Sequence, residues 1–499
     1  MSSDFSRRSL LRAGAGFGLL HLATVPWLSG CADSDSIKSD VALRALGGEL
    51  KGRLLFPTDN AYDAIVRPNN AVWSAAKPKA IALCTGPRDV QACLKYVADY
   101  GEDFAVRSGG HSYAGYSTTA GLLIHVGYMK GVQVDTNAGT ATIQAGMNNQ
   151  DLADALRAYP LAIASGRCPT VGASGLVLGG GWGFAATKAG LTCDSLLSTD
   201  VVLADGRIVQ SNETSEPDLY WAARGGGGGN FGVHAAFTFK LSSVGKLTTF
   251  NLKWAGGHAV EIMLALQKLQ IDHAQMLGMR FKMLPERTGT NFTRDEIHAE
   301  ALGIYWGPST DLLQVFNDLF TLYPPRLRDL RDQDYWAARD YLVTDDPEGL
   351  YDLRSSYVEQ ISPEGLETMV DWMTRWPGGN NLQENLGIFF AIGGKVRELA
   401  PDASAYNHRT SNFIVQQEVS WSALDGDALR KDQSQWLSDY YVALQPFVQP
   451  RSYVNFPDRS MKDWAARYYG SNLARLSQVK AKYDPQNRFR FGQSIPLSI

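Results

Sequence analysis

A histidine in a glycine-rich segment is the first residue of this chain whose surroundings suggest chemistry. His111 directly follows Gly109 and Gly110 in RSGGHSYAGYS, residues 107–117. A neutral imidazole is a good nucleophile near neutral pH, and a Gly-Gly pair lets the backbone approach a ligand closely. Three interpretations fit the segment: a surface turn, a backbone cradle for a phosphate group, and an anchor for a covalently bound cofactor.

Glycine-rich loops recur at 172–183 and 225–232, after the one at 108–115. Any α/β protein needs some glycines in turns, but three such loops favour close backbone approach to a flat or anionic ligand. The P-loop pattern GxxxxGK[ST] is absent, which excludes a P-loop. GGGGGNFG matches GxGxxG by composition alone and follows a predicted helix rather than a strand, so a Rossmann dinucleotide site is not supported.

The elements that position His111 form a predicted β-α-β unit. The apolar run AIALC, residues 80–84, and FAVRS, residues 104–108, are predicted strands. Between them, apolar residues at i, i+3, i+4 and i+7 predict a helix over 86–101 that ends at Gly101. The unit therefore ends where the histidine segment begins.

Further along the chain, short strands are predicted over 121–145, followed by a helix over 148–160 capped by Asn148 or Asn149. The Asp205-Gly206 pair predicts a β-hairpin turn. From about residue 246 the glycine density falls, and amphipathic helices such as those of HAVEIMLALQKLQ and DLLQVFNDLF alternate with strands to about 450. This change in composition predicts a second domain.

The N-terminus and the cysteines indicate the compartment. Arg7 and Arg8 before two leucines resemble a twin-arginine export signal, and LSGC, ending at Cys31, resembles a lipobox. We therefore expect export to the periplasm or cell envelope, with a lipid tether on Cys31 as one option. No CxxC spacing occurs, so no metal site is expected. Cys84 and Cys93 are the only close pair, and a disulfide between them stays open. The net charge of −4 and the absence of a long basic run argue against a nucleic-acid partner.

Four motifs in order identify a family resemblance. RSGGHSYAGYS, GRCPTVGASGLVLGGGWG, WAARGGGGGNFGV and YYGSNLARLSQVKAKYDPQNRFRFGQSI resemble the berberine bridge enzyme-like FAD-linked oxidases of the vanillyl-alcohol oxidase / p-cresol methylhydroxylase superfamily. The resemblance runs from about residue 57 to the C-terminus and is weakest between 250 and 400. It implies an α+β, two-domain vanillyl-alcohol oxidase-type fold, with an FAD-binding domain and an antiparallel-sheet substrate domain. The expected divisions are a signal peptide with its lipobox cysteine (1–31), the FAD-binding domain (32–245), the substrate domain (246–450) and a C-terminal segment that returns to the FAD domain (451–499).

The resemblance also implies the cofactor and its attachment. His111 would bond the 8α-methyl carbon of the flavin ring and Cys168 its C6 carbon, so FAD would be held by two covalent links. A cysteine reacts as its thiolate, which backbone N–H groups can stabilise. Val171 stands where the family has a residue that controls oxygen access, and a small branched side chain there resembles the oxidases. The other cofactor-binding residues implied are Arg107, Ser108, Gly109, Gly110, Gly172, Ser174, Gly175, Gly179, Gly180, Gly181 and Gly183.

The proton acceptor is where this sequence departs from the family. The family pattern is close to YxNYxD, whereas this chain has YVNFPD, with Tyr453 present and Phe456 in place of the second tyrosine. Tyr453, Tyr113 and Gln416 are therefore the catalytic candidates. Tyr453 could equally be a core aromatic residue, and Gln416 could make a structural hydrogen bond.

The implied activity is hydride transfer from a CH–OH carbon of a small-molecule substrate to flavin N5, with O2 reduced to H2O2. Candidate substrates are sugars, oligosaccharides and secondary-metabolite alcohols. The alternatives are a dehydrogenase that passes electrons to a quinone or cytochrome, oxidation of a C–N bond, and a flavoprotein that binds FAD without turnover. The sequence predicts neither the substrate nor the oligomeric state.

Overall fold

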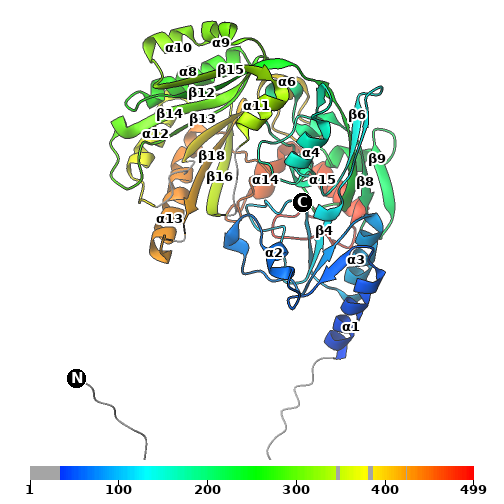
Figure 1. The fold of residues 1–499 in the computed structure, drawn as a ribbon. Coiled ribbons are helices and arrows are strands. Elements are labelled where there is room, and N and C mark those ends of the chain that lie inside the picture. The colour runs from blue at the N-terminus through cyan, green and yellow to red at the C-terminus, as the bar shows by residue number, and fades with distance from the viewer. Residues whose placement is uncertain (1–33, 344–348, 380–385, 423) are drawn as a thin grey trace, which may run out of the picture.

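Three main β-sheets organise the chain, shown in Figure 1 for a computed structural model that describes residues 34–343, 349–379, 386–422 and 424–499. The predicted export signal and Cys31 lie outside the described residues. Within them, no helix is long and apolar enough to cross a membrane.

The first sheet has four strands in the order β1-β2-β4-β3 and carries the histidine segment. Its strands are β1 (Arg53–Leu55), β2 (Ala80–Leu83), β3 (Phe104–Arg107) and β4 (Leu122–His125). The predicted β-α-β unit is confirmed: α3 (Pro87–Tyr100) joins β2 to β3 and ends at Gly101, which has a left-handed φ of 65°. However, β4 lies between β2 and β3, parallel to both, because the crossover through α3 leaves room for one strand.

The second sheet is antiparallel, with the order β5-β6-β10-β8-β9. Its strands are β5 (Val132–Asp135), β6 (Thr140–Gln144), β8 (Leu196–Val202), β9 (Ile208–Asn212) and β10 (Val233–Lys240). The predicted hairpin at Asp205-Gly206 joins β8 to β9, and Gly206 takes a φ of 85°. Helix α4 (Asn149–Leu156) begins after Asn148, whose side chain forms a capping box with Asp151.

The third sheet has seven antiparallel strands, in the order β15-β12-β14-β13-β17-β18-β16. They are β12 (Lys246–Lys253), β13 (Leu277–Pro285), β14 (Ile297–Tyr305), β15 (Leu327–Asp334), β16 (Leu350–Val358), β17 (Gly387–Ala391) and β18 (Phe413–Trp421). One face packs on helices α8 (Ala259–Asp272), α12 (Pro363–Thr374) and α13 (Asp427–Leu444). The opposite face, which includes Phe390 and Ile414, joins the core shared with the first two sheets. The predicted antiparallel sheet with flanking helices is confirmed.

One predicted helix of this region is broken. The segment DLLQVFNDLF forms two short helices, α9 (Ser309–Val315) and α10 (Asn317–Leu322), which meet at Phe316. Phe316 is fully buried, and its ring lies 5.7 Å from that of Phe250 on β12. The helix therefore breaks at the residue whose aromatic ring packs into the core.

The C-terminal segment returns to the first half of the chain. Helices α14 (Trp464–Tyr469) and α15 (Leu473–Tyr483), coloured toward red, lie beside the blue and cyan elements in Figure 1. Lys480 is fully buried, pairs with Asp484 at 2.6 Å, and donates to the carbonyls of Asn230 at 2.8 Å and Phe489 at 2.5 Å. This lysine thus links the C-terminal segment to Asn230, which lies between the five-glycine loop and β10.

The remaining helices are α1 (Ser34–Glu49), α2 (Tyr62–Val66), α5 (Ala173–Leu178), α6 (Ala186–Ala189), α7 (Pro217–Ala222) and α11 (Tyr335–Leu342), and the remaining strands are β7 (Leu161–Ala162) and β11 (Ser242–Ser243). The single-turn helix η1 (Ala71–Trp73) lies near the site described below. Cys84 and Cys93, for which a disulfide was left open, are buried free thiols.

Candidate active site

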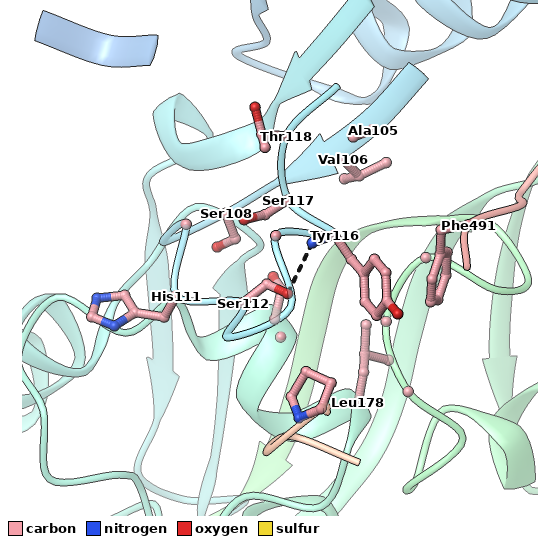
Figure 2. A pocket seen from close by; sticks show the side chains of 18 of the residues that line it. Ala105, Val106, Ser108, His111, Ser112, Tyr116, Ser117, Thr118, Leu178 and Phe491 are labelled. Carbon is pink, nitrogen blue, oxygen red and sulfur yellow. Dashed lines mark hydrogen bonds between the residues drawn. The ribbon is translucent and has the colours of Figure 1, made fainter. Parts of the chain in front are cut away.

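A cavity of about 1210 Å³ collects residues from all four sequence motifs. Its walls include the histidine segment, the cysteine loop before α5, the five-glycine loop, and two C-terminal stretches, 453–459 and 486–493. Figure 2 shows part of the lining, with Ser108, His111 and Ser112 of the histidine segment, Leu178 of α5, and the rings of Tyr116 and Phe491 side by side. Segments that are far apart in sequence therefore build one site.

The two predicted covalent anchors lie on one wall of this cavity. His111 and Cys168 both line it, and Cys168 is buried. The imidazole Nε2 of His111 lies 2.8 Å from Oγ1 of Thr170, two residues beyond the cysteine. This contact ties the histidine segment to the cysteine loop, so both candidate nucleophiles can face one ligand.

Glycines make the two loops fit against each other. A Cβ atom on Gly172 would collide with Oγ of Ser108 and with the backbone N of Gly109. The hydroxyls of Ser108 and Ser174 both donate to the carbonyl of Ala145, at 2.9 Å and 2.6 Å. Part of the glycine content therefore serves contact between loops as well as room for a ligand.

The cavity fits a bound dinucleotide. Gly175 lines it with nothing within 4 Å of an added Cβ, which leaves open space beside the cysteine loop. Ser117 Oγ and Thr118 Oγ1 also line it and are buried without a hydrogen-bond partner among the described residues. Buried polar atoms of this kind point to a ligand that completes their hydrogen bonding. The volume exceeds the roughly 300–1,000 Å³ of an ordinary small-molecule pocket, as a cofactor plus a substrate would require.

Some predicted cofactor residues do not line the cavity but hold the segments that form it. The Arg107 side chain is buried and donates to the backbone carbonyls of Ser117 at 2.8 Å and Ile65 at 2.8 Å, so it fixes the two ends of the histidine segment. Burial lowers its pKa to about 10. The predicted residues that do not line the cavity are Arg107, Gly179, Gly180, Gly181, Gly183 and Gln416, whereas Ser108, Gly109, Gly110, Val171, Gly172, Ser174 and Gly175 do.

Tyr453 lines the cavity as a buried hydrogen-bonding residue. Its hydroxyl oxygen accepts from the backbone N–H of Gly181 at 2.9 Å and from Nδ2 of Asn455 at 3.1 Å. Burial raises its pKa well above the ordinary value of a tyrosine. No acceptor for the hydroxyl hydrogen occurs among the described residues, so the geometry suits a hydrogen-bond donor toward a ligand. This arrangement also gives the GGG loop at 179–181 a role, because it holds that hydroxyl in place.

Aromatic rings surround the cavity next to Tyr453. The ring of Phe456 lies 5.1 Å from that of Tyr453, 5.6 Å from that of Tyr113 and 5.7 Å from that of Phe390 on β17. Tyr113 also contacts Tyr351 of β16, ring to ring at 5.3 Å. Phe456 therefore places an apolar ring where the family pattern has a second tyrosine, and Tyr113 is, beside Tyr453, the cavity tyrosine whose ring packs on it.

Gln416 lies on β18, on the sheet face that also carries Phe390, but its side chain amide is already engaged. Its Nε2 donates to Oε2 of Glu418 at 2.5 Å, and the residue is buried. Sequence reasoning missed Glu418, although the alternation of a strand places residues 416 and 418 on the same face. His234 was also missed: it lines the cavity beside the five-glycine loop, and burial lowers its pKa to about 3, so it stays neutral.

Two protein-family models match segments of this chain. Residues 78–212 match the model of an FAD binding domain, and residues 452–496 match the berberine and berberine-like model. An FAD-linked oxidoreductase of Bacillus subtilis (strain 168), YvdP, is 31% identical over 462 residues, which cover 90% of this chain and 99% of YvdP.

Two solved structures share the fold. Physcomitrella patens BBE-like 1 superposes with a TM-score of 0.81 at 26% identity, covering 92% of this chain and 99% of that one. A chitooligosaccharide oxidase superposes with a TM-score of 0.79 at 24% identity, covering 91% and 99%. The two-domain flavoenzyme fold predicted from the motifs is thereby confirmed.

Proposed function

The chain belongs to the berberine bridge enzyme-like family of FAD-linked oxidoreductases, and from this premise we propose that it is an oxidase with FAD attached through both His111 and Cys168. The observation that carries the proposal is the contact between His111 and Thr170, which brings the histidine to the loop of Cys168 on one cavity wall. Two attachments would hold the flavin in an open cavity that also admits a substrate.

The attachment is tested on denatured protein. Acid-precipitated wild type should keep its flavin absorption, whereas a dissociable cofactor would stay in the supernatant. His111→Ala should retain flavin through Cys168, Cys168→Ala should retain it through His111, and the double variant should release it. Peptide mass spectrometry then locates each link. Flavin that washes out of denatured wild type would overturn the proposal.

The proposed reaction is the oxidation of a CH–OH carbon. Bound FAD supplies the acceptor for the hydride that leaves this carbon. The hydroxyl of Tyr453, held by Gly181 and Asn455, donates a hydrogen bond to the substrate oxygen. As a phenolate, Tyr113 receives the hydroxyl proton, because among the tyrosines that line the cavity it is the one that packs, with Tyr453, against Phe456. The rings around Phe456 exclude water from the reacting carbon.

Oxygen is the proposed electron acceptor, with H2O2 as the product. Val171 lines the cavity three residues from Cys168, and its small side chain leaves space there. Measuring peroxide formed per substrate oxidised in air tests this step, and a ratio near one is expected. Negligible peroxide together with rapid reduction of an artificial dye would instead support a dehydrogenase that serves a quinone or cytochrome.

A panel of sugars, oligosaccharides, aromatic alcohols and amines defines the substrate. Anaerobic bleaching of the flavin is the readout, since it reports substrate oxidation whatever the final acceptor is. We expect bleaching by alcohols of the panel. Bleaching by amines alone would favour C–N oxidation, and no bleaching by any member would favour a flavoprotein without turnover.

We also propose export by the twin-arginine route with a lipid on Cys31, on the basis of the N-terminal sequence. Cys31→Ala should move the protein from the membrane fraction to the soluble fraction, and lysines in place of Arg7 and Arg8 should keep it in the cytoplasm. An unchanged distribution in both variants would contradict the proposal.

A further inference from the structure

An arginine at the mouth of the cavity lies against two aromatic rings. The guanidinium carbon of Arg459 is 4.5 Å from the ring centroid of Trp73 and 5.9 Å from that of Tyr116. All three residues line the cavity, and Arg459 is exposed. Aromatic faces attract a guanidinium and limit its motion.

Both rings are themselves fixed by the histidine segment. The indole N–H of Trp73 donates to the carbonyl of Tyr113 at 2.7 Å, and its ring packs so closely on Gly115 that a Cβ there would collide with it. The backbone N–H of Tyr116 donates to Ser112 Oγ at 3.1 Å (Figure 2), and its ring lies 4.7 Å from that of Phe491. The walls around the guanidinium are therefore preorganised.

No carboxylate or other acceptor bonds the Arg459 guanidinium among the described residues; its recorded contacts are the two rings. The neighbouring Asp458 is buried and committed elsewhere: one oxygen accepts from the Ser460 hydroxyl at 2.7 Å, and the other lies 3.2 Å from Nε of Arg354. By contrast, two other arginines of the cavity are engaged, since Arg488 donates to a backbone carbonyl and Arg490 pairs with Asp103.

We propose that Arg459, between Trp73 and Tyr116, binds an oxyanion at the mouth of the active-site cavity. A planar guanidinium that is already oriented favours bidentate recognition of a carboxylate or phosphate. Two groups carry such chemistry here: a carboxylate of an acidic substrate and the pyrophosphate of FAD. The substrate assignment rests on the proposed oxidase function and would make acidic alcohols the preferred class, whereas the pyrophosphate assignment needs only FAD binding.

The test measures binding rather than turnover. Benzoate and its neutral isostere benzamide are titrated into the holoprotein by calorimetry; neither has a CH–OH group to oxidise, so the result does not depend on oxidase activity. The proteins compared are wild type, Arg459→Gln, Arg459→Lys and Arg475→Gln. Arg475 is the matched control, because it also stacks on an aromatic ring, at 4.1 Å from Trp221, but lies outside the cavity lining. Flavin content per protein is measured for all four.

If the oxyanion belongs to the substrate, wild type binds benzoate about tenfold or more tightly than benzamide, Arg459→Gln loses that preference, and flavin content is unchanged. Arg459→Lys keeps the charge without the planar fork and retains part of the preference. If the oxyanion is the pyrophosphate, wild type shows no preference and Arg459→Gln at least halves the flavin content. A preference that survives Arg459→Gln, or equal binding with equal flavin content in all four proteins, overturns the proposal.

Discussion

The hydroxyl of Tyr453 allows a sharp test of how this site works. Tyr453→Phe removes one oxygen atom from a buried ring that lines the cavity. That oxygen accepts the backbone N–H of Gly181 at 2.9 Å and one amide hydrogen of Asn455 at 3.1 Å. The Asn455 amide keeps its second bond, to the carbonyl of Leu176 at 2.9 Å, but the buried Gly181 N–H loses its acceptor.

The magnitude follows from that loss. A buried donor left without an acceptor costs about 1–3 kcal/mol of unfolding free energy. The effect on catalysis is separate: if the hydroxyl donates to the substrate oxygen, removing one donor from a reacting oxygen lowers the rate of flavin reduction by about 10²-fold. Because burial raises the pKa of Tyr453 far above neutral, this loss should be equal across pH 6–9.

The assay is anaerobic stopped-flow reduction of the flavin, with denaturant unfolding measured in parallel. Tyr113→Phe is the comparison, because in our proposal this phenol takes the proton, so the variant should alter the pH profile as well as the rate. A wild-type profile with a step near pH 8–9 that disappears in Tyr453→Phe would show that Tyr453 acts as a phenolate base. Unchanged stability together with an unchanged rate would refute the hydrogen-bond argument itself.

Three further predictions follow from buried contacts. Gly172→Ala should reduce flavin incorporation because its Cβ collides with the histidine segment, whereas Gly86→Ala, which has open space, should not; flavin-to-protein absorbance ratios decide. Burial lowers the pKa of His408 to about 3, so between pH 3 and about pH 6.5 this histidine is protonated in the unfolded chain but neutral in the folded one. The free energy of unfolding should therefore fall by up to about 1.4 kcal/mol for each pH unit below 6.5. His408→Gln should flatten this pH dependence in denaturant titrations. Arg409→Met should cost about 3–5 kcal/mol, because it leaves the Asp194 carboxylate, whose side chain is 8% exposed, without its cationic partner; the two side chains bond at 2.7 Å and 2.8 Å. The double variant with Asp194→Asn should recover part of the loss in the same titrations.

Local chemistry made much of the fold predictable. The apolar spacing of α3 and the left-handed Gly101 after it specify that helix, and the Asp205-Gly206 turn specifies the β8–β9 hairpin. These signals act over a few residues, and both predictions are confirmed. The position of β4 between β2 and β3, and the break at Phe316, depend on packing against distant segments, which a local pattern does not encode.

The site, too, was only partly predictable from the sequence. The family resemblance implied that His111 and Cys168 would bind one flavin, and both residues line the cavity. The sequence could not distinguish glycines that line the cavity from glycines that bind the Tyr453 hydroxyl or let two loops pack closely, because all of them occur in similar glycine-rich motifs. It also gave no sign of Arg459, whose significance depends on Trp73, a residue nearly 400 positions earlier in the chain.

Phe456 stands where the family pattern has a tyrosine, so a neighbouring residue has to supply the proton acceptor. An apolar ring at this position cannot exchange a proton, yet it contacts the rings of two cavity tyrosines, Tyr113 and Tyr453. Burial raises the pKa of Tyr453 far above neutral, so its phenol stays protonated and can donate a hydrogen bond to a substrate while two N–H donors fix its oxygen. In the proposed mechanism, proton transfer therefore falls to Tyr113, whose backbone carbonyl accepts from the indole N–H of Trp73. The same tryptophan forms one wall of the Arg459 site, so Trp73 supports both the proposed proton acceptor and the proposed oxyanion site.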